Sequence, residues 1–314
     1  MWQATDIKPH ILELNTALAT ADSHESIKQY TAFYGLNFET KIGGLEHTVG
    51  SFEAAGFNLV AHVFKVKNAK GTVFLQHGYY DHVGLYGNVI QHCLNEGYSV
   101  FTYDLPGHGL SSGDRAGIDS FEQYDTVFCA GLEIIKQKMK GPLVAIGQST
   151  GGAVIVNYLL SRGLSSKTSP FQKVYLLAPL VRPIAWRNSV IFYNVARFFI
   201  KKLKREFSEN SHDAHFVNFI STKDPLQPLY VKVNWVGALK SWIKFIEVCE
   251  PVDLEINVIQ GTEDGAVDYR HNMKMLEEKF AHFNVQFIEH GRHHLANEEK
   301  QKLDQVLAVM TPLI

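Results

Sequence analysis

The sequence predicts an α/β fold in which helices cover both faces of a mostly parallel central sheet. From residue 71 onward, short apolar runs alternate with longer segments of helical pattern. This alternation is typical of parallel strands that are buried on both faces by the helices connecting them. The chain has 314 residues, of which 46% are hydrophobic, which is enough for one large core.

The elements are expected in the following order. A helix should contain Ile27, Tyr30 and Tyr34, which recur at helical spacing, and should end near Gly35. Residues 45–66 alternate as two strands joined by a turn at 55–56. Further strands are expected at 72–75, 98–103, 143–146, 174–177, 256–259 and 285–288. Because ligands bind beyond the carboxyl ends of the strands in such sheets, functional side chains are expected in the loops that follow these strands.

One segment interrupts the alternation, since no clear strand is visible between Pro183 and Pro251. It carries an apolar stripe at helical spacing, made of Ile191, Val195, Phe198, Phe199 and Leu203. A basic cluster lies at the end of the stripe, made of Lys201, Lys202, Lys204 and Arg205. We therefore predict an N-terminal helical extension over 1–40 that packs on the core, a core formed by 41–183 and 251–314, and a helical cap over 184–250.

Composition excludes several classes of function. The net charge is −2 and no basic nucleic-acid-binding motif is present, so no nucleic-acid partner is expected. The three scattered cysteines suggest reduced thiols and no disulfide framework. The N-terminus lacks the features of a signal peptide and no apolar run is long enough to span a membrane, so a cytoplasmic protein is expected. The sequence carries no signal of an oligomeric state.

The segment 147–152, Gly-Gln-Ser-Thr-Gly-Gly, is the most informative part of the chain. It places Ser149 in a G-x-S-x-G pattern between an apolar strand and an apolar helix, which is the context of a nucleophile elbow. The glycines would let strand and helix approach closely. Ser149 is therefore predicted to be a catalytic nucleophile, the alternative being a packing turn in which the serine caps the helix.

A serine nucleophile needs a base and an orienting acid. Asp264 directly follows the strand at 256–259 and is the predicted acid, whereas Glu263 is expected to point away and Asp268 to cap the next helix. His293, in the segment His290-Gly-Arg-His-His294, is the predicted base. The clustered histidines could instead bind a metal, but no further Cys or His spacing supports that, so neither a metal nor another cofactor is expected.

The oxyanion of the reaction needs hydrogen-bond donors. The backbone amide of Thr150, directly after the nucleophile, is one predicted donor. The amide of Tyr79, in the loop after the strand at 72–75, is the second. The neighbouring residues Gly78, Tyr80 and Gln148 are predicted to contact the substrate.

Five motifs, in this order, resemble those of the monoacylglycerol lipase and lysophospholipase branch of the α/β-hydrolases, which also includes serine aminopeptidase-like sequences. They are His77-Gly78 with Asp81-His82 and Tyr86, the turn at 104–111, the elbow at 147–152, the acid loop at 261–264 and the histidine loop at 291–298. The resemblance covers about 71–298 and implies an α/β-hydrolase fold with a capped serine esterase site. It also implies a structural role for Asp104 and His108.

This chain departs from the resembled pattern at three places. It has Gln148 where histidine is usual, Thr150 where methionine is usual, and Tyr79-Tyr80 where smaller residues are common. These departures leave the donors in place but change the pocket that the substrate meets.

The resemblance implies hydrolysis of lipid-like acyl esters, such as monoacylglycerols or lysophospholipids. A small-molecule carboxylesterase or an aminopeptidase-like enzyme would use the same three residues. A peptidase would need an acidic group for the substrate amine, for which Glu206 and Glu209 are candidates. A non-catalytic binding protein is a further alternative. The stripe at 191–203 could contact a membrane surface transiently, but we expect it to pack on the body of the protein.

Overall fold

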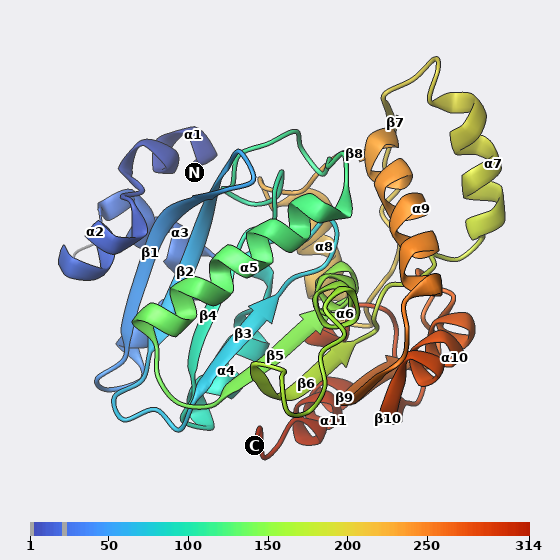
Figure 1. Cartoon of the computed structure of the whole chain (residues 1–314). Coiled ribbons are helices and arrows are strands. Elements are labelled where there is room, and N and C mark those ends of the chain that lie inside the picture. Colours follow the sequence, from blue (N-terminus) through green and yellow to red (C-terminus); the bar gives the residue numbers. More distant parts are fainter. Residues whose placement is uncertain (1–2, 21–23) are drawn as a thin grey trace.

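The computed structural model describes residues 3–20 and 24–314, and its centre is an eight-stranded sheet (Figure 1). In sheet order the strands are β1 (Glu46–Ala54), β2 (Phe57–Lys65), β4 (Ser99–Tyr103), β3 (Thr72–Gln76), β5 (Leu143–Gln148), β6 (Phe171–Leu177), β9 (Val252–Gly261) and β10 (Phe280–Ile288). The first two pairs are antiparallel, and every pair from β4 to β10 is parallel. The predicted fold class is confirmed, and each predicted strand lies at or within one residue of an observed one.

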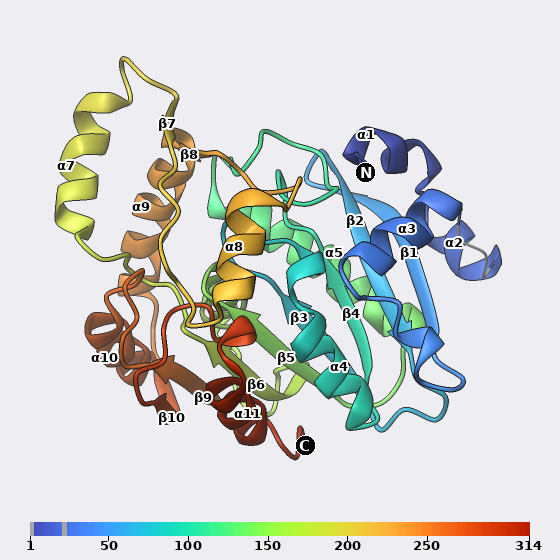
Figure 2. The ribbon, with the colours of Figure 1, turned by 180° about the vertical axis from the view of Figure 1, so that it is seen from behind.

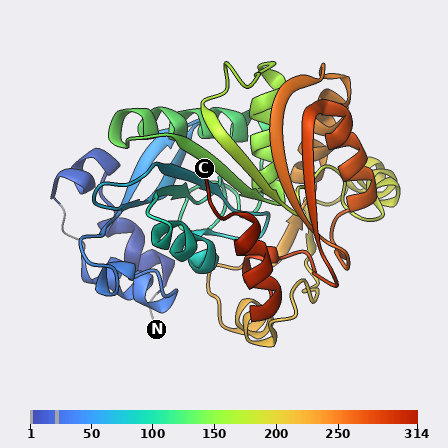
Figure 3. The ribbon, with the colours of Figure 1, turned by 90° about the horizontal axis from the view of Figure 1, so that it is seen from below.

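Helices cover both faces of the sheet (Figures 1, 2 and 3). One face carries α5 (Phe121–Lys138), α6 (Thr150–Ser161) and α10 (Tyr269–Lys279), and the other carries α4 (Gly87–Asn95) and α11 (Lys300–Val309). Side chains alternate between these two layers along each central strand. In β3, for example, Phe74 packs with α5, whereas Val73 and Leu75 pack in the cluster that contains α4.

The N-terminal segment contains α1 (Ala4–Ile7), η1 (Lys8–His10), α2 (Leu14–Thr20), α3 (Glu25–Phe33) and η2 (Phe38–Thr40). Of the predicted extension over 1–40, residues 1–2 and 21–23 lie outside the described ones. Helix α3 lies where the spacing of Ile27, Tyr30 and Tyr34 predicts a helix. The segment before α2 joins the sheet edge, because the Ser51 amide donates to the Leu12 carbonyl at 2.8 Å.

Residues 184–250 contain α7 (Trp186–Ala196), α8 (Ala214–Thr222) and α9 (Val233–Val248), and two strands that the sequence analysis missed. These are β7 (Lys202–Lys204) and β8 (Tyr230–Lys232), which pair antiparallel. The expectation that this segment holds no strand is therefore wrong. Strands of three residues are too short to show an alternation in sequence, and β7 is exposed throughout.

The apolar stripe of the cap also differs from its prediction. Helix α7 ends at Ala196, and Leu203 belongs to β7, so one helix does not carry the whole stripe. The stripe does not pack on the body of the protein, since Ile191 is 65% exposed, Phe198 68% and Phe199 81%. Figure 1 shows α7 at the outer edge of the molecule. Within the described part of the chain, no helix has both the length and the apolar character needed to cross a bilayer.

Candidate active site

Ser149 occupies the sharp turn between β5 and α6. Its φ of 51° and ψ of −113° lie in a region that non-glycine residues rarely adopt. Such strain persists only where the surroundings enforce it. Here the Ser149 amide donates to the Leu177 carbonyl at 2.9 Å. Gly151 is required for the turn, because a Cβ atom there would lie 2.3 Å from the Gln76 carbonyl oxygen.

The three predicted catalytic side chains meet at the carboxyl ends of three strands. Ser149 follows β5, Asp264 follows β9 and His293 follows β10. His293 Nε2 lies 2.9 Å from Ser149 Oγ, and His293 Nδ1 lies 2.8 Å from Asp264 Oδ2. This chain of contacts matches the geometry in which a histidine accepts a serine proton while a carboxylate fixes its tautomer.

Asp264 is held by its own loop. Its Oδ1 accepts hydrogen bonds from the amides of Ala266 at 2.8 Å and Val267 at 3.1 Å, and its Oδ2 accepts one from Gln260 Nε2 at 3.0 Å. Burial opposes the charged forms of both Asp264 and His293, but their mutual attraction outweighs it. The pKa of Asp264 is therefore lowered and the pKa of His293 raised.

The competing carboxylates lie elsewhere, as the sequence analysis expected. Glu263 is exposed and accepts a hydrogen bond from His290 Nδ1 at 2.7 Å. Asp268 caps α10 by accepting from the His271 amide at 3.3 Å.

Two backbone amides, those of Tyr79 and Thr150, are the predicted oxyanion donors near Ser149. Among the described residues, neither the Tyr79 nor the Thr150 amide donates to a protein acceptor. The loop that carries Tyr79 is tightly built, because the Gly78 amide donates to the Tyr86 hydroxyl at 3.0 Å, and this hydroxyl donates to Asp81 at 2.8 Å. A Cβ at Gly78 would lie 2.8 Å from Asp81 Oδ2 and 3.4 Å from Ser149 Cβ, so only glycine fits beside the nucleophile.

A cavity of about 300 Å³ opens above Ser149 and His293, between the sheet and the cap. Most of its apolar wall comes from Leu180, Pro183, Trp186, Val231, Trp235, Val236 and Val267. Its polar wall comes mainly from Tyr80, Asp81, Arg205, Glu206, Ser208 and Asn210. Tyr80, a predicted substrate contact, is thus one of the residues that line this cavity. Of the two acidic candidates for binding an amine, Glu206 lines the cavity, whereas Glu209 is bound to Arg292 at 3.2 Å.

Gln148 does not lie where the sequence analysis predicted. It is buried and absent from the cavity wall. Its Nε2 donates to the His293 carbonyl at 3.1 Å, and its Oε1 accepts from the Ala296 amide at 3.1 Å. The side chain is thus a clamp on the histidine loop rather than a substrate contact. Sequence reasoning missed this because nothing local links residue 148 to residues 293–296.

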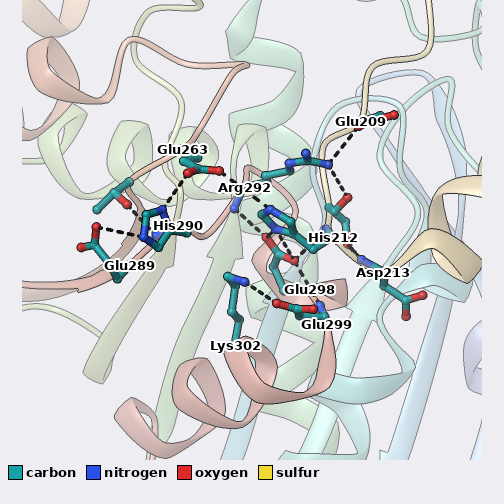
Figure 4. Close-up of polar contacts among 12 residues, drawn as sticks. Glu209, His212, Asp213, Glu263, Glu289, His290, Arg292, Glu298, Glu299 and Lys302 are labelled. Atoms are coloured by element: carbon teal, nitrogen blue, oxygen red, sulfur yellow. Dashed lines mark hydrogen bonds and ion pairs between the residues drawn. The ribbon is translucent and has the colours of Figure 1, made fainter.

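Glu298 is a second clamp on the same loop that the sequence analysis did not identify (Figure 4). Its buried carboxylate accepts hydrogen bonds from the backbone amides of Arg292 at 2.6 Å, His212 at 2.8 Å and Glu299 at 3.1 Å. Burial opposes its charge, but these amides together with the His212 side chain lower its pKa. The carboxylate therefore joins the loop that carries His293 to the cap.

Asp224 joins three further parts of the molecule. Its carboxylate lies 2.9 Å from His82 Nε2 in the loop after β3, and it accepts hydrogen bonds from the Tyr34 hydroxyl at 2.6 Å and from Gln227 at 2.9 Å. Burial opposes its charge, but His82 and the other partners lower the pKa of Asp224 to about 2. The N-terminal helix α3 therefore helps to support the site, a role that no motif in the sequence indicates.

Asp104 and His108 occupy structural positions. Asp104 accepts from the backbone amides of Val83 and Leu110, both at 2.8 Å, and His108 Nδ1 lies 2.8 Å from the Pro106 carbonyl. Both side chains are fully buried and lie outside the cavity wall.

Comparison with known proteins identifies the family. A family model described as Hydrolase_4, serine aminopeptidase S33, matches residues 67–300. The chain belongs to this S33 family. A monoglyceride lipase homolog from monkeypox virus is 30% identical over 115 residues, which cover 36% of this chain and 39% of the relative. Human monoglyceride lipase is 27% identical over 115 residues, 36% of each chain. The chain thus aligns with less than two fifths of the length of these relatives.

Solved structures share the fold of this chain. A soluble variant of monoglyceride lipase from Saccharomyces cerevisiae, in complex with a substrate analog, has a TM-score of 0.69 at 18% identity, covering 83% of this chain and 92% of that one. A carboxyl esterase from Bacillus coagulans has a TM-score of 0.66 at 16% identity, covering 85% and 96%. These likenesses show the fold. The predicted membership of this S33-family chain in the monoacylglycerol lipase branch of the α/β-hydrolases is confirmed.

Glu298 gives a test of how the histidine loop is held. We expect Glu298→Gln to speed amide hydrogen exchange in residues 290–298 by about tenfold or more, because a side-chain amide has one acceptor oxygen for the three amides that the carboxylate serves. Exchange is measured by mass spectrometry on the folded protein. Glu299→Gln is the matched control, since the exposed Glu299 carboxylate forms an ion pair with Lys302 in the first turn of α11. Equal exchange in both variants would contradict the role of Glu298.

Proposed function

We propose that this protein is a serine hydrolase that cleaves carboxylic esters of lipid-like substrates through an acyl-enzyme on Ser149. The observation that carries the proposal is the contact chain from Ser149 Oγ through His293 to Asp264 at the floor of a cavity. The names of its curated relatives, monoglyceride lipases, support the substrate class.

Acylation follows from the positions of these groups. Ser149 Oγ attacks the ester carbonyl carbon as His293 Nε2 takes the hydroxyl proton. Asp264 stabilises the imidazolium that forms. The carbonyl oxygen becomes an oxyanion that accepts hydrogen bonds from the amides of Tyr79 and Thr150. When the intermediate collapses, the bond to the leaving oxygen breaks and His293 returns its proton to the departing alcohol.

In deacylation, water is the nucleophile and Ser149 Oγ is the leaving group. A water molecule loses a proton to His293 Nε2 and attacks the acyl carbon, and the proton passes to Ser149 Oγ as the carboxylic acid leaves. The proposed steps require no metal or organic cofactor, since each proton transfer is assigned to His293 and each oxyanion to backbone amides.

The apolar wall supports an acyl chain as the group that enters the cavity. A second apolar cavity of about 140 Å³ lies beneath α7 and shares the wall residues Ser189, Val231 and Val236 with the first. An acyl chain longer than the main cavity would continue into this space. A small-molecule carboxylesterase would use the same Ser149, His293 and Asp264 side chains. An aminopeptidase-like enzyme would also need Glu206 to bind the substrate amine.

Ser149→Ala tests the proposal directly. We expect this variant to lose ester hydrolysis by a factor of about 10³ or more, because the nucleophile is removed while the fold is kept. It should also lose covalent labelling by a fluorophosphonate probe, which the parent protein should show. Hydrolysis of p-nitrophenyl esters, monoacylglycerols, lysophospholipids and aminoacyl anilides by both proteins also separates an esterase from a peptidase. A binding protein without catalysis would leave the probe unreacted in both.

The raised pKa of His293 predicts the pH dependence of the reaction. Its Nε2 must be unprotonated to take the serine proton, so kcat/KM should rise with pH through an apparent pKa above the ordinary value of about 6.5. After burial, which lowers the pKa of His293, the attraction of Asp264 and then of Asp81 raises it. Asp81→Asn should therefore move the acidic limb to lower pH.

Glu209→Gln is the control for this profile, since it removes an exposed carboxylate that is bound to Arg292. Profiles of kcat/KM for a soluble ester measure both variants. If the acidic limb of kcat/KM in Asp81→Asn stays in place or moves to higher pH, Asp81 does not raise the pKa that controls the profile.

We also propose transient contact of the cap with a lipid surface. The exposed side chains of the stripe lie on α7 and just after it, beside the exposed Lys201, Lys202 and Lys204. Apolar side chains flanked by cations are typical of segments that lie in a membrane interface. Arg205, grouped with these lysines in the sequence analysis, lines the catalytic cavity instead.

Co-sedimentation with liposomes tests this contact. Replacing both Phe198 and Phe199 by serine should weaken binding at least tenfold, because each buried phenylalanine contributes about 1.5–3 kcal/mol. Phe287→Ser is the control, since this side chain is 42% exposed on β10 at the far edge of the sheet. The contact is excluded if the parent protein fails to sediment with both neutral and anionic liposomes.

A further inference from the structure

We propose that Arg205 binds an anionic group carried by the leaving alcohol of the ester, so that the preferred substrates are esters whose alcohol part bears a carboxylate or phosphate. This inference rests on the proposed ester hydrolysis and names the class of substrate for the same cavity. It comes from one cation in the polar wall, from the contacts that hold this cation, and from the fact that no carboxylate of the described residues forms an ion pair with it.

The Arg205 guanidinium is held rigidly. Its central carbon lies 4.0 Å from the ring centroid of Tyr80 and 4.4 Å from that of Phe207. Its Nη1 donates to Gln227 Oε1 at 2.9 Å, and Gln227 is fixed in turn by Asp224 at 2.9 Å. Arg205 is half-buried, so this arrangement keeps one orientation of the donor fork in the cavity wall. Such a fixed fork is suited to the oxygens of a carboxylate or a phosphate.

Within the described part of the chain, no carboxylate forms an ion pair with Arg205, although Asp81 and Asp224 lie near enough to attract its charge. In the ranges 3–20 and 24–314, no carboxylate oxygen lies within 4.0 Å of an Arg205 nitrogen. The two carboxylates of the polar wall are placed differently. Asp81 accepts from Tyr86 and lies 3.3 Å from His294 Nε2, and Glu206 is exposed. The positive charge of Arg205 is therefore available to a substrate.

The backbone of Tyr80, which packs against Arg205, is strained. Its φ is 71°, a left-handed value that costs a bulky aromatic residue of the order of 1–3 kcal/mol. The strained backbone places the ring in the cavity wall against Arg205. A smaller residue at position 80 would remove the ring that packs against the Arg205 guanidinium.

The position of the polar wall assigns the anion to the alcohol side. The Asn210 carbonyl accepts from the His294 amide at 2.7 Å, which places residues 205–210 of the wall next to the loop of His293. His293 is the group that protonates the leaving oxygen. The apolar residues that line the cavity suit the acyl chain.

The test uses soluble esters, so that no lipid surface takes part. The substrates are 4-(butyryloxy)benzoate, its neutral counterpart 4-(butyryloxy)benzamide, and the monophenyl ester of glutaric acid, which carries its charge on the acyl side. The measured quantity is the ratio of kcat/KM for the benzoate to that for the benzamide. Intrinsic leaving-group reactivity cancels when this ratio is compared between proteins.

We expect Arg205→Gln to lower this ratio by about 10- to 100-fold, the size of one charged hydrogen-bond pair. Gln227→Leu should lower it by less, because it removes one hydrogen bond that orients Nη1 but keeps the charge and the weaker bond from Nη1 to the Pro228 carbonyl at 3.4 Å. Lys244→Gln removes an exposed cation elsewhere on the cap and should leave the ratio unchanged.

Three results would overturn the inference. An equal loss on both esters in Arg205→Gln would mean that the arginine only anchors the cap to Tyr80. A selective loss on the glutarate ester would move the anion to the acyl side. Unchanged kcat/KM values for all three esters would mean that Arg205 does not contact the substrate. Failure of the proposed function is distinct, since the parent protein would then hydrolyse none of the three esters.

Discussion

The position of one imidazole constrains the rest of the structure. His293 must lie within hydrogen-bond distance of Ser149 Oγ and Asp264 Oδ2 at the same time, although it belongs to a loop with little secondary structure of its own. Two buried side chains hold this loop in position. Gln148 holds the loop from the elbow, and Glu298 holds it from the side of the cap. Because both clamps bind backbone groups, the loop is fixed without occupying the imidazole nitrogens.

The same principle explains why the cap and the N-terminal helix are joined to the site. Asp224 binds His82 in the loop that contains Tyr79, and it also binds Tyr34 at the end of α3. A buried pair of this kind stabilises little relative to apolar packing, but removing one partner leaves an unpaired buried charge and costs about 3–5 kcal/mol. The pair is thus better understood as a device that fixes the relative positions of three segments than as a source of stability.

The sequence predicted what local chemistry determines. The strands, the elbow with its glycines and the order of serine, acid and histidine all follow from short motifs, and the structure brings Ser149, Asp264 and His293 into contact. The contacts that the sequence analysis missed join residues that are far apart in the chain. Gln148 and Ala296 are separated by 148 positions, and Tyr34 and Asp224 by 190, so no pattern reveals either contact. The strands β7 and β8 were missed because three residues are too few to show a period, and the exposed stripe because helical spacing does not reveal what a face packs against.

The two tyrosines that depart from the resembled pattern unite these observations. Tyr79 stacks on Trp235 of α9 with ring centroids 3.8 Å apart and donates its hydroxyl to the Ala116 carbonyl at 2.7 Å. Tyr80 packs against Arg205 from the other part of the cap. Two adjacent rings thus connect the loop of one proposed oxyanion donor, the Tyr79 amide, to two parts of the cap. Smaller residues here would leave the donor amides in place but remove this connection, so in this chain the shape of the substrate cavity and the position of the donor loop depend on the same pair of side chains.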